Sequence, residues 1–309
     1  MKLFRSILPI LLLSFVAQAQ SPVRDGAILA EFSVSDSTKV CFSQGNLQYQ
    51  ASSKTWRFAE HQWDFVGDSI NGNVYENGVK SDNAKISSTY DGWIDNLGWG
   101  TSGYKRKKAY MTSTDNTDYG DGHNDITGTN YDWGVYNAIS NGGNQAGQWR
   151  TLTRSEWDYV ISHRPNARYL RGTATVNGVN GLILLPDNRI SQIGVVFTYG
   201  ENGLILLPDY RILPTGVVFT YGENDWSQNT YSASDWSKME ANGAVFLPAT
   251  GGRDGTNVIF LGGYGFYWSI SESGSHCAST LAFGSKHVNT CNIGRYDGHS
   301  VRLVQNVRK

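Results

Sequence analysis

Residues able to do chemistry gather near the end of the chain. His276, Cys277, His287, Cys291 and His299 fall within 24 residues. Imidazole and thiolate groups are the usual ligands of zinc, so a zinc site is one interpretation of this cluster. Their spacing matches no zinc motif, and the alternative is that they belong to a surface of mixed composition.

The stretch that holds them, residues 262–305, alternates two kinds of position. The first kind is apolar, aromatic or turn-forming at strand-like spacing, which predicts short buried strands joined by turns. We call these the framework positions: Tyr267, Trp268, Ser269, Ala278, Leu281, Phe283, Val288, Gly298, Ser300, Val301 and Arg302.

The residues between the framework positions share no charge sign, periodicity or catalytic spacing. Varied side chains on rigid strands are typical of a surface that binds a partner, so we call them the recognition positions. They are His276, Cys277, Ser279, Thr280, Lys286, His287, Asn289, Thr290, Asn292, Ile293, Tyr296, Asp297 and His299.

Three long side chains in this stretch have structural rather than binding roles in our interpretation. We expect Trp268 in the core with its indole N–H bonded. We expect Arg302 to anchor the closing strand through a buried carboxylate, with Glu156 and Asp158 as candidates. Arg295 is expected to pack along a loop.

The cysteine count is odd. Cys41, Cys277 and Cys291 are the three cysteines, so at least one thiol is free or paired outside the chain. A bridge between Cys277 and Cys291 stays open, because spacing alone does not decide it.

A second candidate site is an oxygen-rich loop. Residues 113–125 are dense in Asp and Asn, and carboxylate and amide oxygens are ligands that Ca²⁺ accepts. The loop lacks EF-hand spacing, and the alternative is a solvated loop of Asx turns. Apart from the zinc interpretation above, we expect no cofactor other than a possible Ca²⁺ ion in this loop. The candidate ligands are Asp115, Asp118, Asp121, Asn124 and Asp125.

The N-terminus predicts export. Lys2 and Arg5 precede an apolar run at 7–16, and an A-x-A cleavage site follows at 17–19. The run is too short to span a bilayer. We therefore expect a signal peptide at 1–19 and a cell-surface, periplasmic or extracellular protein without membrane insertion.

Composition narrows the class of protein. Charged residues make up 17% of the chain and the net charge is −1, which favours neither nucleic acid nor an anionic membrane as a partner. The 35 Gly, 10 Trp and 17 Tyr indicate short strands and long loops. Motifs such as G-x-S-x-G, H-E-x-x-H, Walker A and C-x-x-C are missing from the sequence, so we do not predict an enzyme.

Short strands are predicted in the first quarter of the chain. Residues 27–50 alternate apolar and polar side chains around an Asp-Ser turn, which predicts a β-hairpin. Residues 56–58 and 63–65 are expected to add strands to the same sheet. Residues 67–128 contain few aliphatic side chains and are expected to form a long loop region.

Helix signals follow. A short helical segment is expected to begin at 132–138. Thr153, with Glu156 three residues later, forms a capping box, the clearest helix start in the chain. Another helix is expected over 232–242, and a strand over 243–248.

Residues 181–224 hold a tandem duplication. Residues 181–202 (GLILLPDNRISQIGVVFTYGEN) and 203–224 (GLILLPDYRILPTGVVFTYGEN) are adjacent 22-residue units. Each predicts a strand, a Pro-Asp turn and a second strand. Only one unit is needed in the core, so the other must bulge, pair at an edge or compete for the same place. The units differ only at Asn188/Tyr210, Ser191/Leu213, Gln192/Pro214 and Ile193/Thr215.

Three segments together resemble a known family. WRTLTRSEWDY at 149–159 resembles the "R-L-P-T-E-A-E-W-E-Y" helix of formylglycine-generating-enzyme-like (sulfatase-modifying-factor) domains, which have a C-type-lectin-like fold. YWS at 267–269 and GHSVR at 298–302 resemble the closing strands of that domain. The C-terminus is more similar to a subset, the exported variable proteins of diversity-generating retroelements in Bacteroides-type bacteria. The resemblance covers about residues 32–304.

This resemblance implies a fold and a function. It implies an α+β, C-type-lectin-like single domain over 20–309, with short twisted antiparallel sheets, two short helices and long loops. It implies that 262–305 is a variable region whose recognition positions bind a protein or glycan. The related enzymes use a C-x₄-C pair, whereas Cys277 and Cys291 are 14 apart. The remaining alternatives are a structural subunit of a surface appendage and an oxidase of the same fold.

Overall fold

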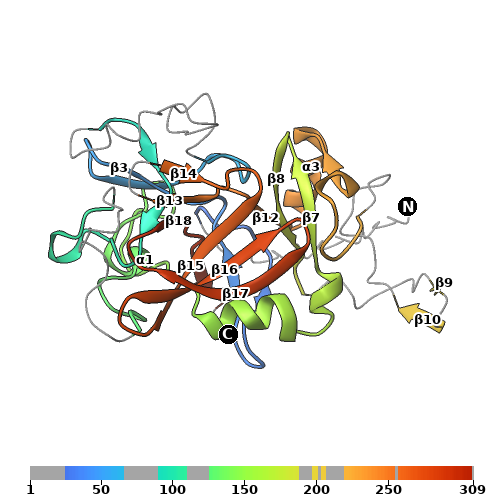
Figure 1. The fold of residues 1–309 in the computed structure, drawn as a ribbon. Coiled ribbons are helices and arrows are strands. Elements are labelled where there is room, and N and C mark those ends of the chain that lie inside the picture. The colour runs from blue at the N-terminus through green and yellow to red at the C-terminus, as the bar shows by residue number, and fades with distance from the viewer. Residues whose placement is uncertain are drawn as a thin grey trace, which may run out of the picture.

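The computed structural model describes residues 25–65, 90–109, 125–187, 197–200, 203–206, 219–254 and 257–307. The predicted signal peptide lies outside these residues. So do four of the calcium candidates, Asp115, Asp118, Asp121 and Asn124. The described chain is α+β, with mostly small antiparallel sheets and few helices, as predicted (Figure 1).

A three-stranded antiparallel meander carries most of the recognition positions. It consists of β15 (Tyr264–Ser273), β16 (Cys277–Gly284) and β17 (His287–Gly294), in that spatial order (Figure 1). β16 is the central strand and is almost wholly buried, whereas β17 lies at the edge. The framework positions predicted these strands because strand side chains alternate between two faces.

Five further small sheets complete the described strands. Every strand pair in them is antiparallel except β11–β7. The two three-stranded sheets are β1 (Phe32–Ser33)–β2 (Lys39–Phe42)–β19 (Val304–Asn306) and β4 (Thr55–Phe58)–β3 (Leu47–Gln50)–β5 (Trp93–Ile94). The two four-stranded sheets are β14 (Asn257–Ile259)–β13 (Gly252–Asp254)–β18 (Gly298–His299)–β6 (Leu97–Gly98) and β11 (Thr230–Tyr231)–β7 (Arg171–Val176)–β8 (Val179–Leu184)–β12 (Val245–Pro248). The two-stranded sheet is β9 (Phe197–Gly200)–β10 (Gly203–Leu206).

Three short α-helices occur in the described chain, each at a segment where the sequence predicted a helix. α1 begins after the N-cap Asp132, at the predicted start of the first helical segment. The capping box of Thr153 and Glu156 is present and begins α2. None of the described helices is both long and apolar enough to cross a membrane. The helices are α1 (Trp133–Tyr136), α2 (Arg154–Asp158) running into the π-helical η3 (Tyr159–His163), α3 (Ala233–Ala241), and the 3₁₀ turns η2 (Tyr104–Arg106), η4 (Ala167–Tyr169) and η6 (Trp226–Gln228).

One buried cluster contains residues from near both ends of the described chain. Phe42 of β2 and Val304 of β19 belong to one buried cluster with Trp157 of α2 and Leu281 of β16. β19 also pairs with β2, so the last strand closes onto one of the first. Residues at the two ends therefore fold together around the meander.

The strand predictions in the first quarter are partly wrong. The strand predicted at 56–58 is present as β4 and pairs with β3 of the segment 27–50, but β3 lies in a different sheet from the hairpin of β1 and β2. Residues 63–65 form no strand. Alternation identifies a strand but not its neighbour, which long-range pairing decides. The predicted loop region 67–128 also contains the short strands β5 and β6.

The duplicated units share one place in the fold. The start of the first unit forms β8, which pairs with β7 and β12. The end of the second unit, at 219–224, lies against β7 through a bridge between Gly172 and Gly222. The two middle halves pair with each other as β9 and β10. The core therefore uses half of each copy.

Candidate functional site

Framework residues anchor the meander through hydrogen bonds from buried side chains to other segments of the chain. The Trp268 side chain is fully buried, and its Nε1–H donates to the Leu97 carbonyl at 2.7 Å, as predicted. The Tyr267 hydroxyl donates to the Pro248 carbonyl at 2.9 Å and accepts from Asn46 Nδ2 at 3.1 Å. These bonds satisfy the buried polar ends of both aromatic side chains.

Arg302 is buried, but the predicted carboxylate partner is wrong. Its guanidinium donates to Gln62 Oε1 at 2.6 Å and to the Phe246 carbonyl at 3.3 Å. Burial lowers the Arg302 pKa to about 10, an effect that Tyr267 and Glu240 oppose. Gln62 lies immediately before the segment 63–65 that was mistaken for a strand, so its proximity to Arg302 was not predictable from pattern.

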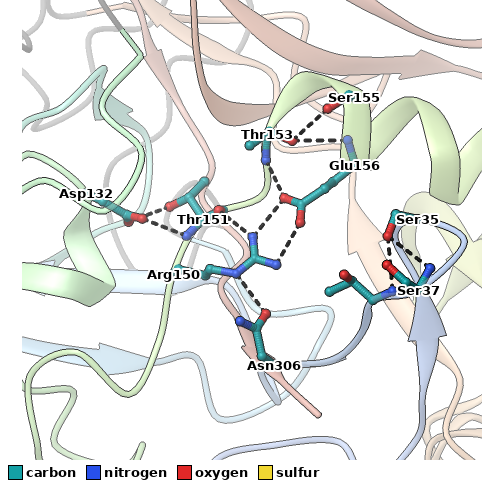
Figure 2. A network of polar contacts seen from close by, with 10 residues as sticks. Ser35, Ser37, Asp132, Arg150, Thr151, Thr153, Ser155, Glu156 and Asn306 are labelled. Atoms are coloured by element: carbon teal, nitrogen blue, oxygen red, sulfur yellow. Dashed lines mark hydrogen bonds and ion pairs between the residues drawn. The ribbon is translucent and has the colours of Figure 1, made fainter. Parts of the chain in front are cut away.

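Helix α2 is clamped at its start, as Figure 2 shows. The two carboxylate oxygens of Glu156 accept from Arg150 Nη1 and Nη2 at 2.8 and 2.7 Å, and Oε2 also accepts from the Thr153 N–H at 2.8 Å. Arg150 Nε donates to Asn306 Oδ1 at 2.9 Å. Because Asn306 belongs to β19, the clamp ties α2 to the closing strand.

A buried carboxylate extends this network (Figure 2). Asp132 Oδ2 accepts from the Thr151 N–H at 3.0 Å, and Oδ1 accepts from the Thr151 hydroxyl at 2.9 Å. Burial raises the Asp132 pKa to about 6, although these bonds oppose the shift. Asp132 thereby fixes the strand-like segment that leads into α2.

One face of the meander contacts α2, and we call it the α2 face. Thr290 Oγ1 donates to Asp158 Oδ1 at 2.8 Å. Asn292 Oδ1 accepts from Arg154 Nη1 at 3.2 Å and from Ser279 Oγ at 3.0 Å. These three recognition positions therefore interact with the protein itself, and the Ser279 side chain is buried.

The opposite face, which we call the β18 face, carries a different set of recognition positions. In the β16–β17 register Cys291 lies opposite Thr280, and Asn289 lies opposite Ala282. Directly paired residues of antiparallel strands share a face. Cys277 pairs with Gly294 and so lies on the α2 face, away from Cys291. Both thiols are free, which decides against the bridge that the sequence left open.

The exposed end of the β18 face carries a group that we call the aromatic patch: Phe260, Tyr264, His287 and Asn289. Phe260 is 57% exposed and Tyr264 39% exposed. The Tyr264 ring lies 5.4 Å from the Phe260 ring and 5.4 Å from the His287 ring. Asn289 follows His287 on the same face of β17 and is exposed.

Sequence reasoning missed the two most exposed aromatic members of this patch. Phe260 and Tyr264 flank the Gly262–Gly263 pair, just before the framework begins. A signal was present, because Tyr264 lies three residues before Tyr267, and an odd separation along a strand puts two side chains on opposite faces. Strand alternation from Tyr267 places Phe266 and Tyr264 on the opposite face.

Three recognition positions are buried, which corrects their assignment to an exposed face. Besides Ser279, these are Thr280, whose hydroxyl donates to the Tyr267 carbonyl at 2.8 Å, and His299. The His299 ring lies 4.4 Å from Trp268 and 5.0 Å from Phe266. Burial lowers the His299 pKa to about 3, so the ring is neutral.

The remaining recognition positions lie at the edges of the meander. His276 and Lys286 are exposed in its turns, and Tyr296 and Asp297 are half-buried after β17. Burial and the neighbouring Asp254 raise the Asp297 pKa to about 6. The half-buried Ile293 packs against the core on the β18 face.

Arg295 packs along a loop, as predicted. Its Nη2 donates to Glu272 Oε2 at 3.0 Å and to the Gly274 carbonyl at 2.7 Å, while Nε donates to the Cys277 carbonyl at 3.0 Å. The guanidinium also lies 4.5 Å from the Trp99 ring. Arg295 therefore holds the β15–β16 turn.

The described residues show no metal-binding arrangement for the zinc or the calcium interpretation. No three His, Cys, Asp or Glu side chains among them are gathered closely enough to hold an ion. Asp125, the described calcium candidate, accepts a bond from the Glu272 N–H at 2.8 Å. Calcium binding stays a prediction that rests on the loop before it.

The comparisons with known proteins found no match to this chain among protein-family models, curated proteins or solved structures.

Proposed function

We propose that this chain is an exported, non-enzymatic protein that binds a protein or glycan ligand on the β18 face of its meander. The resemblance of its motifs to C-type-lectin-like variable proteins supports that fold and that use. The observation that best supports this proposal is the aromatic patch, where exposed polar recognition positions lie next to exposed aromatic rings.

The composition of the patch suits recognition. Tyr264 and Phe260 offer large contact areas with only two side-chain torsions to fix, so binding orders little. His287 and Asn289 add hydrogen-bonding groups that adapt to different partners. The patch rests on the buried β16 strand, so its backbone is rigid before a ligand arrives.

The oxidase alternative receives less support. The related enzymes act through a pair of cysteines, whereas Cys277 and Cys291 lie on opposite faces of the sheet. Burial raises the Cys291 pKa, which reduces its thiolate fraction. The appendage alternative predicts that the pure protein forms filaments.

Ligand binding is tested in two steps. The protein without residues 1–19 is screened on a glycan array and on an array of purified extracellular proteins, and the strongest hit is titrated by calorimetry. Ala substitutions at Tyr264, His287 and Asn289 together should weaken that hit by at least about 30-fold, because exposed anchors dominate binding energy.

A matched control substitutes three surface residues of α3 with Ala: Ser234, Ser237 and Lys238. This control should change affinity less than threefold, and both variants should melt within a few degrees of the parent. Equal affinity of the patch variant and the parent would place the ligand elsewhere and refute the proposed site.

Diversification of the recognition positions is tested separately, in the gene. A neighbouring reverse transcriptase and a near-identical template repeat, with mismatches at template adenines, would support it. If neither is found, the variable-protein part of the proposal fails, while the binding site remains testable as above.

A further inference from the structure

The sheet β11–β7–β8–β12 contains the start of the first duplicated unit as β8, and the end of the second unit lies against its strand β7. Leu182 and Leu184 of the first unit are buried in one core cluster, and Ile183 in another. Asp187, at the end of that half, forms an ion pair with the buried Arg164, in which Oδ1 lies 2.9 Å from Nη1. The first unit therefore occupies its place firmly through Asp187.

The second unit supplies the other half of the same place. Phe219 is buried, with its ring against Gly172 of β7. Gly222 donates its N–H to the Arg171 carbonyl at 2.9 Å, and Glu223 pairs with the Arg171 guanidinium at 2.5 Å. Every one of these contacts is made by a residue that the first unit also contains.

The spare residues are identical in type and order. Residues 197–202 and 219–224 both read FTYGEN, so Phe197 stands for Phe219 and Glu201 for Glu223. The backbone of 197–200 is already extended, as β9, and pairs with β10. In Figure 1 this hairpin stands at the right-hand edge, apart from β7 and β8.

We propose that residues 197–202 and 219–224 exchange places against β7. In the observed arrangement residues 219–224 lie against β7, while β9 and β10 pair with each other. In the alternative the first unit fills the place alone, and the extra residues, now 203–224, leave before Asp225. The contacts with Arg171 and Gly172 are the same in both arrangements.

The two arrangements have similar free energies for a simple reason. They bury the same side chains and extrude the same number of residues, and loop-closure entropy depends only weakly on where a long loop lies. The alternative exit point is an irregular stretch just before η6, where no strand is interrupted. Exchange within one chain also outcompetes exchange between molecules, because the effective concentration of a tethered segment is in the millimolar range.

The first half of the repeat is not exchanged in this proposal. β8 follows β7 through the tight turn at Asn177 and Gly178, and Val176 pairs with Val179. Replacing 181–184 by 203–206 would insert the extra residues directly after that turn. β8 therefore stays in place while the second half changes.

The test is a pair of substitutions in the full chain. Phe219→Ala should change the folded-to-unfolded ratio less than about tenfold, because exchange brings Phe197 into the emptied place. Phe197→Ala alone should change it even less. The double variant has no Phe to offer and should lose a factor of about 100 or more, the usual cost of removing a buried Phe.

Phe246→Ala is the matched control. Phe246 is buried in the same core cluster and has no copy elsewhere in the repeat, so its loss should resemble that of the double variant. If Phe219→Ala alone destabilises as much as the double variant does, the arrangement is fixed and the proposal is wrong.

Amide hydrogen exchange of the unmodified protein tests independently whether the two segments change places. Exchange of the segments predicts that the Gly200 and Gly222 amides are protected to within about tenfold of each other, because each spends time against β7. Protection of Gly222 more than about 1000-fold above that of Gly200 would overturn the proposal, even if none of the Phe variants lost stability.

Discussion

His299 shows how far a single residue can depart from its appearance in the sequence. It lies among polar residues between framework positions, yet its ring is buried against Trp268 and Phe266. Within the described residues its Nδ1 has no hydrogen-bond partner. A neutral ring is the form that such a place tolerates, since charging it there costs solvation.

Acid should therefore destabilise the fold through His299. Its pKa is about 3 in the folded chain and 6.5 ordinarily, so the unfolded chain takes up the proton first as pH falls. Above pH 6.5 the ring is neutral in both the folded and the unfolded chain, so its titration has no effect there, and stability is lost progressively as pH falls from 6.5 to 3. His299→Leu should remove this loss, improving on the parent by about 2 kcal/mol more at pH 5 than at pH 8.

Urea unfolding at the two pH values measures the effect. His163→Leu, at an exposed histidine, is the control and should keep the parental pH dependence. A His299→Leu variant that loses stability in acid as steeply as the parent would contradict this account.

At the scale of elements, helix α2 had the clearest local signal and positions one side of the meander. Its capping box closes two N–H groups at the helix start, and Arg150 joins the box to Asn306. Arg154 and Asp158 of the same helix then hold Asn292 and Thr290 of β17. The local cap and the position of the edge strand are therefore linked.

Thr153→Ala should lower the free energy of unfolding by about 1 kcal/mol, the usual value of an N-cap side chain. The loss follows because the Glu156 N–H is left without its Thr153 acceptor. Chemical denaturation measures it, and Ser234→Ala on the exposed side of α3 should cost less than about 0.5 kcal/mol. Equal losses in the two variants would show that the cap is not stabilising.

The sequence of the duplicated unit predicted its strands clearly, but it left their place in the fold ambiguous. Its strands are predictable from apolar runs, but two nearly identical copies leave open which copy supplies each strand, because the strand-forming residues are the same in both. Only the contacts with β7 and β12 show that the halves come from different copies in the observed arrangement.

At the scale of the whole molecule, Arg302 joins distant parts of the chain. Its guanidinium bonds Gln62, near the start, and the Phe246 carbonyl of β12. Asn46 lies at 3.5 Å from the same group. Three separate segments thus share one buried cation that closes the C-terminus onto the body.

Arg302→Leu should destabilise the protein by about 3 kcal/mol, because it leaves buried oxygens of Gln62 and Phe246 without their donor. Thermal and urea denaturation measure the loss. Arg168→Leu, at an exposed arginine, is the control and should change stability by less than about 0.5 kcal/mol. A neutral Arg302→Leu variant would show that leucine packing compensates for the lost bonds.

The sequence by itself determined several short strands and helices, the capping box of α2, and the buried framework of the meander. Those features follow from local periodicity and side-chain chemistry, which act between near neighbours. Trp268 was expected in the core for that reason, and it is there.

Only the tertiary structure decided which recognition positions reach the surface, and which oxygens face Arg302. It also brought Tyr264 beside both Phe260 and His287, and placed the end of the second repeat unit against the sheet that contains the start of the first. These outcomes depend on packing between segments far apart in the chain. Side-chain spacing along one strand carries no information about what another segment will cover.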